Sequence, residues 1–180
     1  MEINDIKTPN DILAFMQEHI RYGWVDINGQ EHINKMDNFR RLYRISSLEE
    51  TLEHGIGTCI EQVYLIKCLL DKIDIPNKMF CTRIYEGENF NNLDEEEHMH
   101  CFILYYMNNK VYHLEHPNWK NIGIHEYDSE YDAINKINNY YIEMSNGRAR
   151  PVTEFYEVTP GLSFKEFNLY INSLDHKKRK

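Results

Sequence analysis

The segment that most constrains the fold is CIEQVYLIKCLLDK, which runs from Cys59 to Lys72. It begins with a capping box, Thr58–Glu61, and its apolar side chains surround most of the helix circumference. A helix that is apolar on most sides has to be covered by other elements on most sides. We therefore predict a buried central helix that begins at Cys59, and a chain of 180 residues is long enough to cover it.

Capping boxes and apolar spacing of the helical kind predict further helices before and after this one. We expect Gly23 to end the first helix and Gly55 to end the second. The predicted helices begin at Thr8–Asp11, Ser47–Glu50, Ser129–Asp132 and Ser163–Glu166, the last of them running to about Leu174.

Strand signals dominate the middle of the chain, after Ile75-Pro76. Two of the expected strands flank Asn108-Asn109, which favours a short hairpin turn because Asn tolerates a positive φ. The predicted strands are Asn77–Tyr85, His98–Met107, Lys110–His116 and Val152–Val158.

The order of these elements indicates an α+β fold with an antiparallel sheet. Neither an internal repeat nor a linker divides the chain, so we expect a single domain over residues 1–180. We divide it into a helical N-terminal part (residues 1–47), a core (about residues 48–127) and a helix–strand–helix part (residues 128–180).

Charge and cysteine content exclude several classes of protein. The net charge of −9 argues against nucleic-acid binding through overall electrostatics, and we expect no membrane span. The N-terminus does not resemble a signal peptide, which predicts a cytoplasmic protein. Four cysteines without a C-x-x-C pair then predict free thiols, and we expect no cofactor and no structural metal. The acidic segment 86–97 is expected to be a solvated flap that disfavours acidic substrates.

Cys59 differs from the other three cysteines in its position. If Thr58 caps the helix, Cys59 lies in the first turn, where free backbone N–H groups and the helix dipole favour a negative charge. This position predicts a lowered thiol pKa and a nucleophilic thiolate. The glycines of Gly55-Ile56-Gly57 leave room for a substrate to approach.

A candidate base and its orienting acid lie on the predicted hairpin. If Asn108-Asn109 is a two-residue turn, Phe102 faces Glu115, and His100 is a diagonal neighbour of Glu115 on the same face, about 7–8 Å away at the backbone. His98 and His113 share this face, but His100 lies closer to Glu115. A Cys59–His100–Glu115 triad would therefore provide a nucleophile, a base and an orienter.

These motifs, in this order, resemble the transglutaminase-like superfamily, in particular its bacterial branch. The resemblance covers about residues 48–127 and implies a papain-like Cys–His–Asp/Glu arrangement, with Glu115 in place of the commoner Asp. It also implies that Trp24, in the upstream stretch Tyr22–Asp26, helps the backbone N–H of Cys59 to stabilise an oxyanion. The implied activity is that of a protease, an amidase or deamidase, or a transglutaminase, acting on the amide or peptide carbonyls of a peptide or protein substrate.

Two alternatives remain open at the sequence level. One is a non-catalytic binding module on the same fold, in which the acidic segment 86–97 binds a basic partner. The other is a zinc site made by His98, His100, His113 and Glu115 on one face of the hairpin. The sequence does not indicate an oligomeric state.

Overall fold

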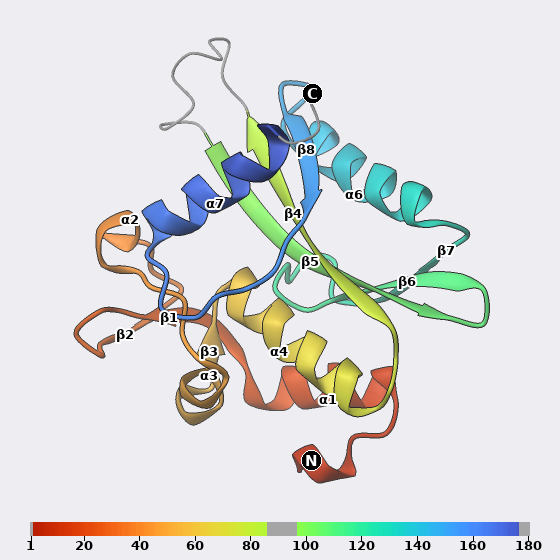
Figure 1. Cartoon of the computed structure of the whole chain (residues 1–180), viewed down its shortest axis with the longest axis horizontal. Coiled ribbons are helices and arrows are strands. Elements are labelled where there is room, and N and C mark those ends of the chain that lie inside the picture. Colours follow the sequence, from red (N-terminus) through yellow and green to blue (C-terminus); the bar gives the residue numbers. More distant parts are fainter. Residues whose placement is uncertain (1, 86–96, 177–180) are drawn as a thin grey trace.

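Helix α4 (Cys59–Lys72) is the buried helix that its apolar circumference predicts. The computed structural model describes residues 2–85 and 97–176, and in it α4 crosses one face of a large sheet (Figure 1). Its side chains Val63, Ile66 and Leu70 are completely buried. Helices α1 (Pro9–His19) and α3 (Leu48–His54) cover the sides of α4 that the sheet does not.

The large sheet is antiparallel throughout, as predicted, and has the strand order β7-β6-β5-β4-β8. Strand β5 is central and is the longest of the five. The bounds are β4 (Asn77–Tyr85), β5 (Glu97–Met107), β6 (Lys110–Glu115), β7 (Gly123–Tyr127) and β8 (Arg150–Phe155).

The turn between β5 and β6 confirms the predicted register. Asn108 and Asn109 have φ of 54° and 59°, as a two-residue hairpin turn with two left-handed residues requires. The pairs run from Met107↔Lys110 to Leu104↔His113, so the strands mirror each other about the two asparagines. A one-residue slip would have moved His113 and Glu115 together to the other face of the sheet.

The alternation of side chains along β4 and β5 builds two separate cores. Met79, Cys81, Cys101 and Ile103 face α4, together with side chains from α1 and from α7 (Phe164–His176). Phe80, Phe102 and Leu104 face the other way, toward α6 (Glu130–Met144). The large sheet therefore separates α1, α4 and α7 from α6 (Figure 1).

The N-terminal part differs from the prediction because it is not wholly helical. Helix α1 ends at His19, and the chain continues as β1 (Arg21–Val25) rather than extending to Gly23. Strand β1 pairs with β2 (Glu31–Ile33) and, in parallel, with β3 (Ile56–Gly57). Gly23 is a strand residue: a Cβ there would lie 2.8 Å from the carbonyl oxygen of His32, so the glycine permits close strand pairing instead of ending a helix.

The short elements and some boundaries also lie outside the prediction. The structure adds a 3-10 turn at Ile3–Asp5 and α2 at Phe39–Leu42. Strand β8 begins before Val152 and ends at Phe155, and α7 extends to His176. The expected acidic flap at 86–97 falls outside the described residues, apart from Glu97 at the start of β5.

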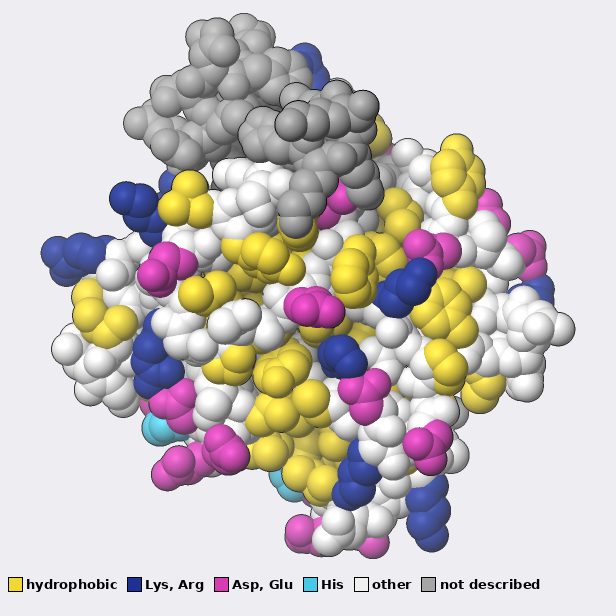
Figure 2. Space-filling model, in the orientation of Figure 1, with side chains coloured by type: hydrophobic (Ala, Val, Ile, Leu, Met, Phe, Trp, Pro, Cys, Tyr) yellow, Lys and Arg dark blue, Asp and Glu magenta, His cyan; other side chains and the backbone are white. Residues whose placement is uncertain are grey.

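The surface in the orientation of Figure 1 carries interspersed acidic and basic side chains, with hydrophobic side chains gathered over α4 and α1 (Figure 2). In the parts of the chain that the structure describes, no helix combines the length and the apolar character needed to cross a membrane.

Candidate active site

The N-terminus of α4 is held by a buried carboxylate, that of Glu61. This side chain accepts hydrogen bonds from the Tyr43 hydroxyl (2.7 Å), from the N–H of Ser46 (3.2 Å) and from the N–H of Thr58 (2.9 Å). Thr58 in turn accepts from the N–H of Ile60 at 3.2 Å, so the predicted capping box is present. These bonds fix the first turn of α4 and with it the position of Cys59.

Cys59 is the first residue of α4, so its N–H has no acceptor within the helix. The thiol is 8% exposed and interacts with two neighbours, Cys101 and His100. The Cys101 thiol and burial raise the pKa of the Cys59 thiol, whereas His100 lowers it. On balance the pKa of the Cys59 thiol lies well above its ordinary value, so the predicted lowering is wrong for this arrangement. Cys101, a neighbour that the sequence did not indicate, and burial outweigh the effect of His100.

Contact with both Cys101 and His100 places Cys59 at an open side of β5. Successive side chains of a strand, such as those of His100 and Cys101, point to opposite faces of the sheet. The Cys59 thiol can therefore approach both of them only from beside the strand. The described ladder with β6 runs from Met107 to Leu104, and His100 is paired only with Thr82 on β4. The end of β6 therefore leaves room for the helix start beside β5.

His100 and Glu115 meet as the hairpin register predicts. The His100 Nε2 lies 2.8 Å from Glu115 Oε2, and both side chains are buried. Burial alone would lower the pKa of His100, but the charge of Glu115 and the Cys59 thiol raise it to about 10. Burial alone would raise the pKa of Glu115, but the charge and the Nε2–H of His100, together with His113, hold it far below its usual range. Because His100 Nε2 is hydrogen-bonded to Glu115, the other ring nitrogen, Nδ1, is the one available to the Cys59 thiol.

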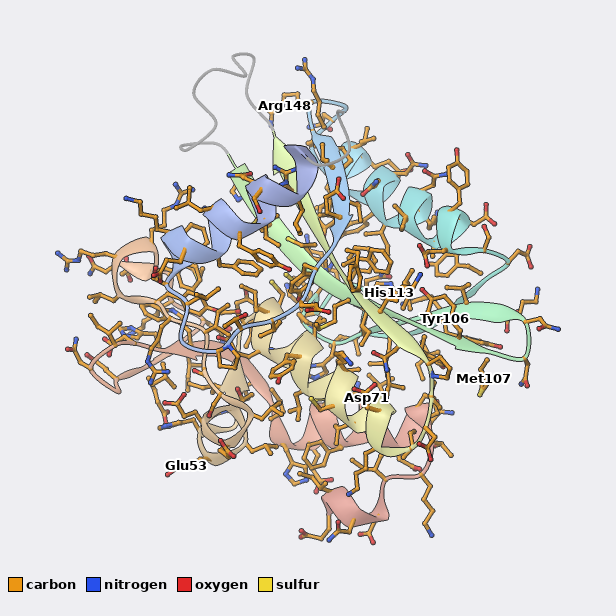
Figure 3. All side chains as sticks on the ribbon, in the orientation of Figure 1. Glu53, Asp71, Tyr106, Met107, His113 and Arg148 are labelled. Carbon is orange, nitrogen blue, oxygen red and sulfur yellow. The ribbon has the colours of Figure 1, made fainter. Side chains whose placement is uncertain are left out.

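Two further groups hold the Glu115 carboxylate. The N–H of Asn118 donates to Oε1 at 3.0 Å, and His113 Nε2 lies 3.3 Å from Oε2. His113 lies near the middle of the molecule, against the large sheet (Figure 3), and burial lowers its pKa, so it stays neutral beside the carboxylate. The sequence had placed His113 on this face and had given it a role only in the zinc alternative.

A second buried link ties the helix start to the chain that follows β6. Gln62 donates to the carbonyl oxygen of Gly57 (2.7 Å) and accepts from His116 Nδ1 (2.6 Å). Burial lowers the pKa of His116, so the ring remains neutral. Sequence reasoning missed this pair, because an apolar helix containing one Gln shows no signal for a partner 54 residues away.

Trp24 does not support the role that the resemblance implies. Its side chain is 1% exposed in the main core, and its indole N–H already donates to the carbonyl oxygen of Lys35 at 2.7 Å. The ring also stacks on His32, with centroids 4.0 Å apart. With its only donor occupied, Trp24 is a packed core residue. The same strand instead brings Tyr22 beside Cys59. The side chain is partly exposed, but desolvation of its hydroxyl and the neighbouring thiol raise the pKa of Tyr22, so the hydroxyl keeps its proton.

Two pockets open on either side of the Cys59–His100 pair. The larger, of about 890 Å³, is lined by His100 together with residues of β1, of the segment after β6 and of α6. The smaller, of about 420 Å³, is lined by Cys59. Both pockets are lined by Tyr22, Met36, His98 and Met99, so they adjoin at these four residues, with His100 in one pocket and Cys59 in the other.

The described residues do not show the geometry that the zinc alternative requires. Within residues 2–85 and 97–176, no group of three or more His, Cys, Asp or Glu side chains is arranged to hold a metal ion. His98 lines the two pockets, whereas His113 lies in a separate small cavity behind Glu115. The four residues of that hypothesis therefore do not converge on one point.

No protein-family model matches the chain, and comparison with curated proteins gives no match. Among solved structures, the chain is similar to an arylamine N-acetyltransferase from Bacillus cereus, described as having a Cys-His-Glu catalytic triad. The identity is 15% and the TM-score 0.39, and the similarity covers 62% of this chain and 42% of the other. At so low a TM-score, the likeness by itself assigns neither a fold family nor a function to this chain.

Proposed function

We propose that the chain is a cysteine-dependent acyl-transfer enzyme that acts on amide or peptide carbonyls. The observation that carries this proposal is the buried contact between His100 Nε2 and Glu115 Oε2, at 2.8 Å, with the Cys59 thiol beside the same imidazole. A nucleophile, a base and an orienter in contact are the arrangement that nucleophilic acyl transfer needs. Two adjoining pockets, one lined by His100 and the other by Cys59, provide space for both parts of a substrate.

The mechanism begins when the Cys59 thiol loses its proton, a step that His100 favours and that Cys101 and burial oppose. The Cys59 thiolate attacks the carbonyl carbon, and the N–H of Cys59, at the start of α4, stabilises the oxyanion. The Tyr22 hydroxyl, which keeps its proton, is a second donor near the thiol. The His100 imidazolium gives its proton to the leaving amine as the C–N bond breaks, which leaves a thioester on Cys59.

The second half of the reaction reverses the role of His100. Water or an acceptor amine gives a proton to the neutral imidazole as it attacks the thioester, and the carboxylate of Glu115 stabilises the cation that forms again. Water as acceptor gives a protease, amidase or deamidase, and an amine gives a transglutaminase. The peptide or protein substrate expected from the sequence resemblance belongs to this proposal.

Alkylation with iodoacetamide at graded pH, followed by peptide mapping, tests the proposal. Cys68 on the same helix is an internal control, because it is more exposed than Cys59 and burial raises its pKa. We expect Cys59 to react faster than Cys68 at neutral pH, and His100→Ala to abolish the difference. Faster labelling of the more accessible Cys68, unaffected by His100→Ala, would favour the non-catalytic binding module.

A further inference from the structure

Eleven large hydrophobic side chains of the described residues are exposed, and several of them gather around the pocket beside His100. Five of them line it: Tyr22, Met36, Trp119, Ile122 and Met144. They come from β1, from the segment after β2, from the segment after β6 and from α6. Trp119 is 76% exposed. Apolar side chains that converge from four parts of the chain on one concave surface are typical of a ligand site.

The charge of this surface is opposite to that of the protein. The chain has 29 acidic and 20 basic residues, yet among the residues described no Asp or Glu lines either of the two adjoining pockets. The larger pocket is lined by Arg21 and Lys120, and the smaller by Arg40. The Glu115 carboxylate faces the separate cavity behind His100.

The cation and the apolar surface meet at one position on the rim. The Lys120 Nζ lies 5.5 Å from the centroid of the Trp119 ring. Such a pair offers a flat apolar face and a positive charge to the same ligand. Arg21, at the beginning of β1, adds a second exposed cation to the lining of this pocket.

We infer that the pocket beside His100 binds an aromatic or large apolar group that carries a negative charge, and that this group belongs to the substrate. This assignment to the substrate rests on the proposed function. His100 delivers its proton on this side of Cys59, so the bound group is the one that leaves or accepts. A cationic acceptor such as a lysine side chain would meet Arg21 and Lys120, and none of the described lining residues offers it a carboxylate.

Binding is measured with the Cys59→Ala variant, so that no turnover is needed. Trp119 reports on the pocket, because the chain has two tryptophans and the other, Trp24, is buried. The probes form a matched series: N-acetylphenylalanine is an anion, its amide is neutral and phenylalanine amide is a cation. N-acetylglycine is the anion without the ring. A tripeptide ending in phenylalanine, with a free or an amidated carboxyl group, distinguishes a peptide source from a small acid.

We expect N-acetylphenylalanine to change Trp119 emission and to bind at least about threefold more tightly than its amide, the size of effect that exposed charge pairs produce. The cation and N-acetylglycine should bind more weakly still. Lys120→Glu and Arg21→Glu should remove the preference for the anion in calorimetric titrations. Lys165→Glu, an exposed position on α7 outside the pocket, changes the net charge equally and should leave it intact.

Equal binding of the acid and its amide, or tightest binding of the cation, would overturn the inference. So would a loss of preference in Lys165→Glu equal to that in Lys120→Glu, since the effect would then come from the net charge. The proposed function and the proposed substrate class can be refuted independently of each other. Normal binding with an unreactive Cys59 refutes the enzyme, whereas a reactive Cys59 without selective binding refutes only the substrate class.

Discussion

Replacing Glu115 by Gln tests the electrostatic core of the site. The side chain is 2% exposed, and its two oxygens accept from His100 and from the N–H of Asn118, with His113 Nε2 3.3 Å away. Gln has the same shape and keeps one acceptor oxygen, so the hairpin and its register should persist. What the substitution removes is the negative charge that keeps His100 protonated.

The expected change follows from the contact at 2.8 Å between His100 and Glu115. A hydrogen bond to a charged partner contributes roughly 1.5–3 kcal/mol, and one pKa unit corresponds to about 1.4 kcal/mol. The pKa of His100, about 10 in the native protein, should therefore fall by about one to two units in Glu115→Gln. The pKa of His113 should also fall, because the same carboxylate raises it against the effect of burial.

The assay is a titration of histidine ring resonances by NMR, with protein labelled at histidine. The chain contains nine histidines, and the resonance of His100 is identified by its absence in His100→Gln. Glu126→Gln is the matched control, since Glu126 lies on the neighbouring strand β7, is exposed and accepts from Tyr112. This control should leave the pKa of His100 unchanged.

Two results would refute the reasoning. One is a native His100 that titrates near 6.5, the ordinary value for an isolated histidine. The other is a pKa of His100 that stays the same or rises in Glu115→Gln. Either would mean that the carboxylate orients the ring without stabilising its charged form, and that His100 does not begin the reaction as an imidazolium.

Three further predictions concern stability and reactivity. The raised pKa of His100 contributes stability that is complete below pH 6.5 and is lost as the pH rises through about 10. Urea denaturation should show that the free energy of unfolding falls by on the order of 3 kcal/mol over this pH range. The fall should be smaller in His100→Gln. Cys101→Ala should lower the pKa of Cys59 and speed its alkylation, whereas Cys81→Ala should change it less; equal effects would exclude the specific contact. Glu61→Ala leaves several buried donors unpaired and should destabilise the protein by about 3–5 kcal/mol in urea titrations; a loss under about 1 kcal/mol would contradict this.

Local signals were sufficient for most of the elements that position the site. The capping box at Thr58 located the start of α4, and Asn108-Asn109 located the turn. Both depend on bonds or dihedral angles within a few residues, which a sequence shows directly. The hairpin register then followed by counting, and it brought His100 to Glu115.

The short strands β1 to β3 gave no such signal. They have five, three and two residues, too few for an alternating pattern to stand out. Gly23 was predicted to end a helix because a glycine near a helix end commonly does so. Its real reason, close approach to the backbone of His32, depends on a strand that the sequence did not reveal.

By itself, then, the sequence determined that a cysteine begins a buried helix and that a histidine and an acid share one face of a hairpin. Only the tertiary structure decided that the helix start meets β5 where β6 ends, which brings Cys59 to His100 and also to Cys101. It likewise buried Trp24, brought Tyr22 to the thiol and collected cations and apolar side chains beside His100. The physical reason is range: caps, turns and register act over a few residues, whereas burial, pKa values and pockets depend on groups that meet only when distant segments pack.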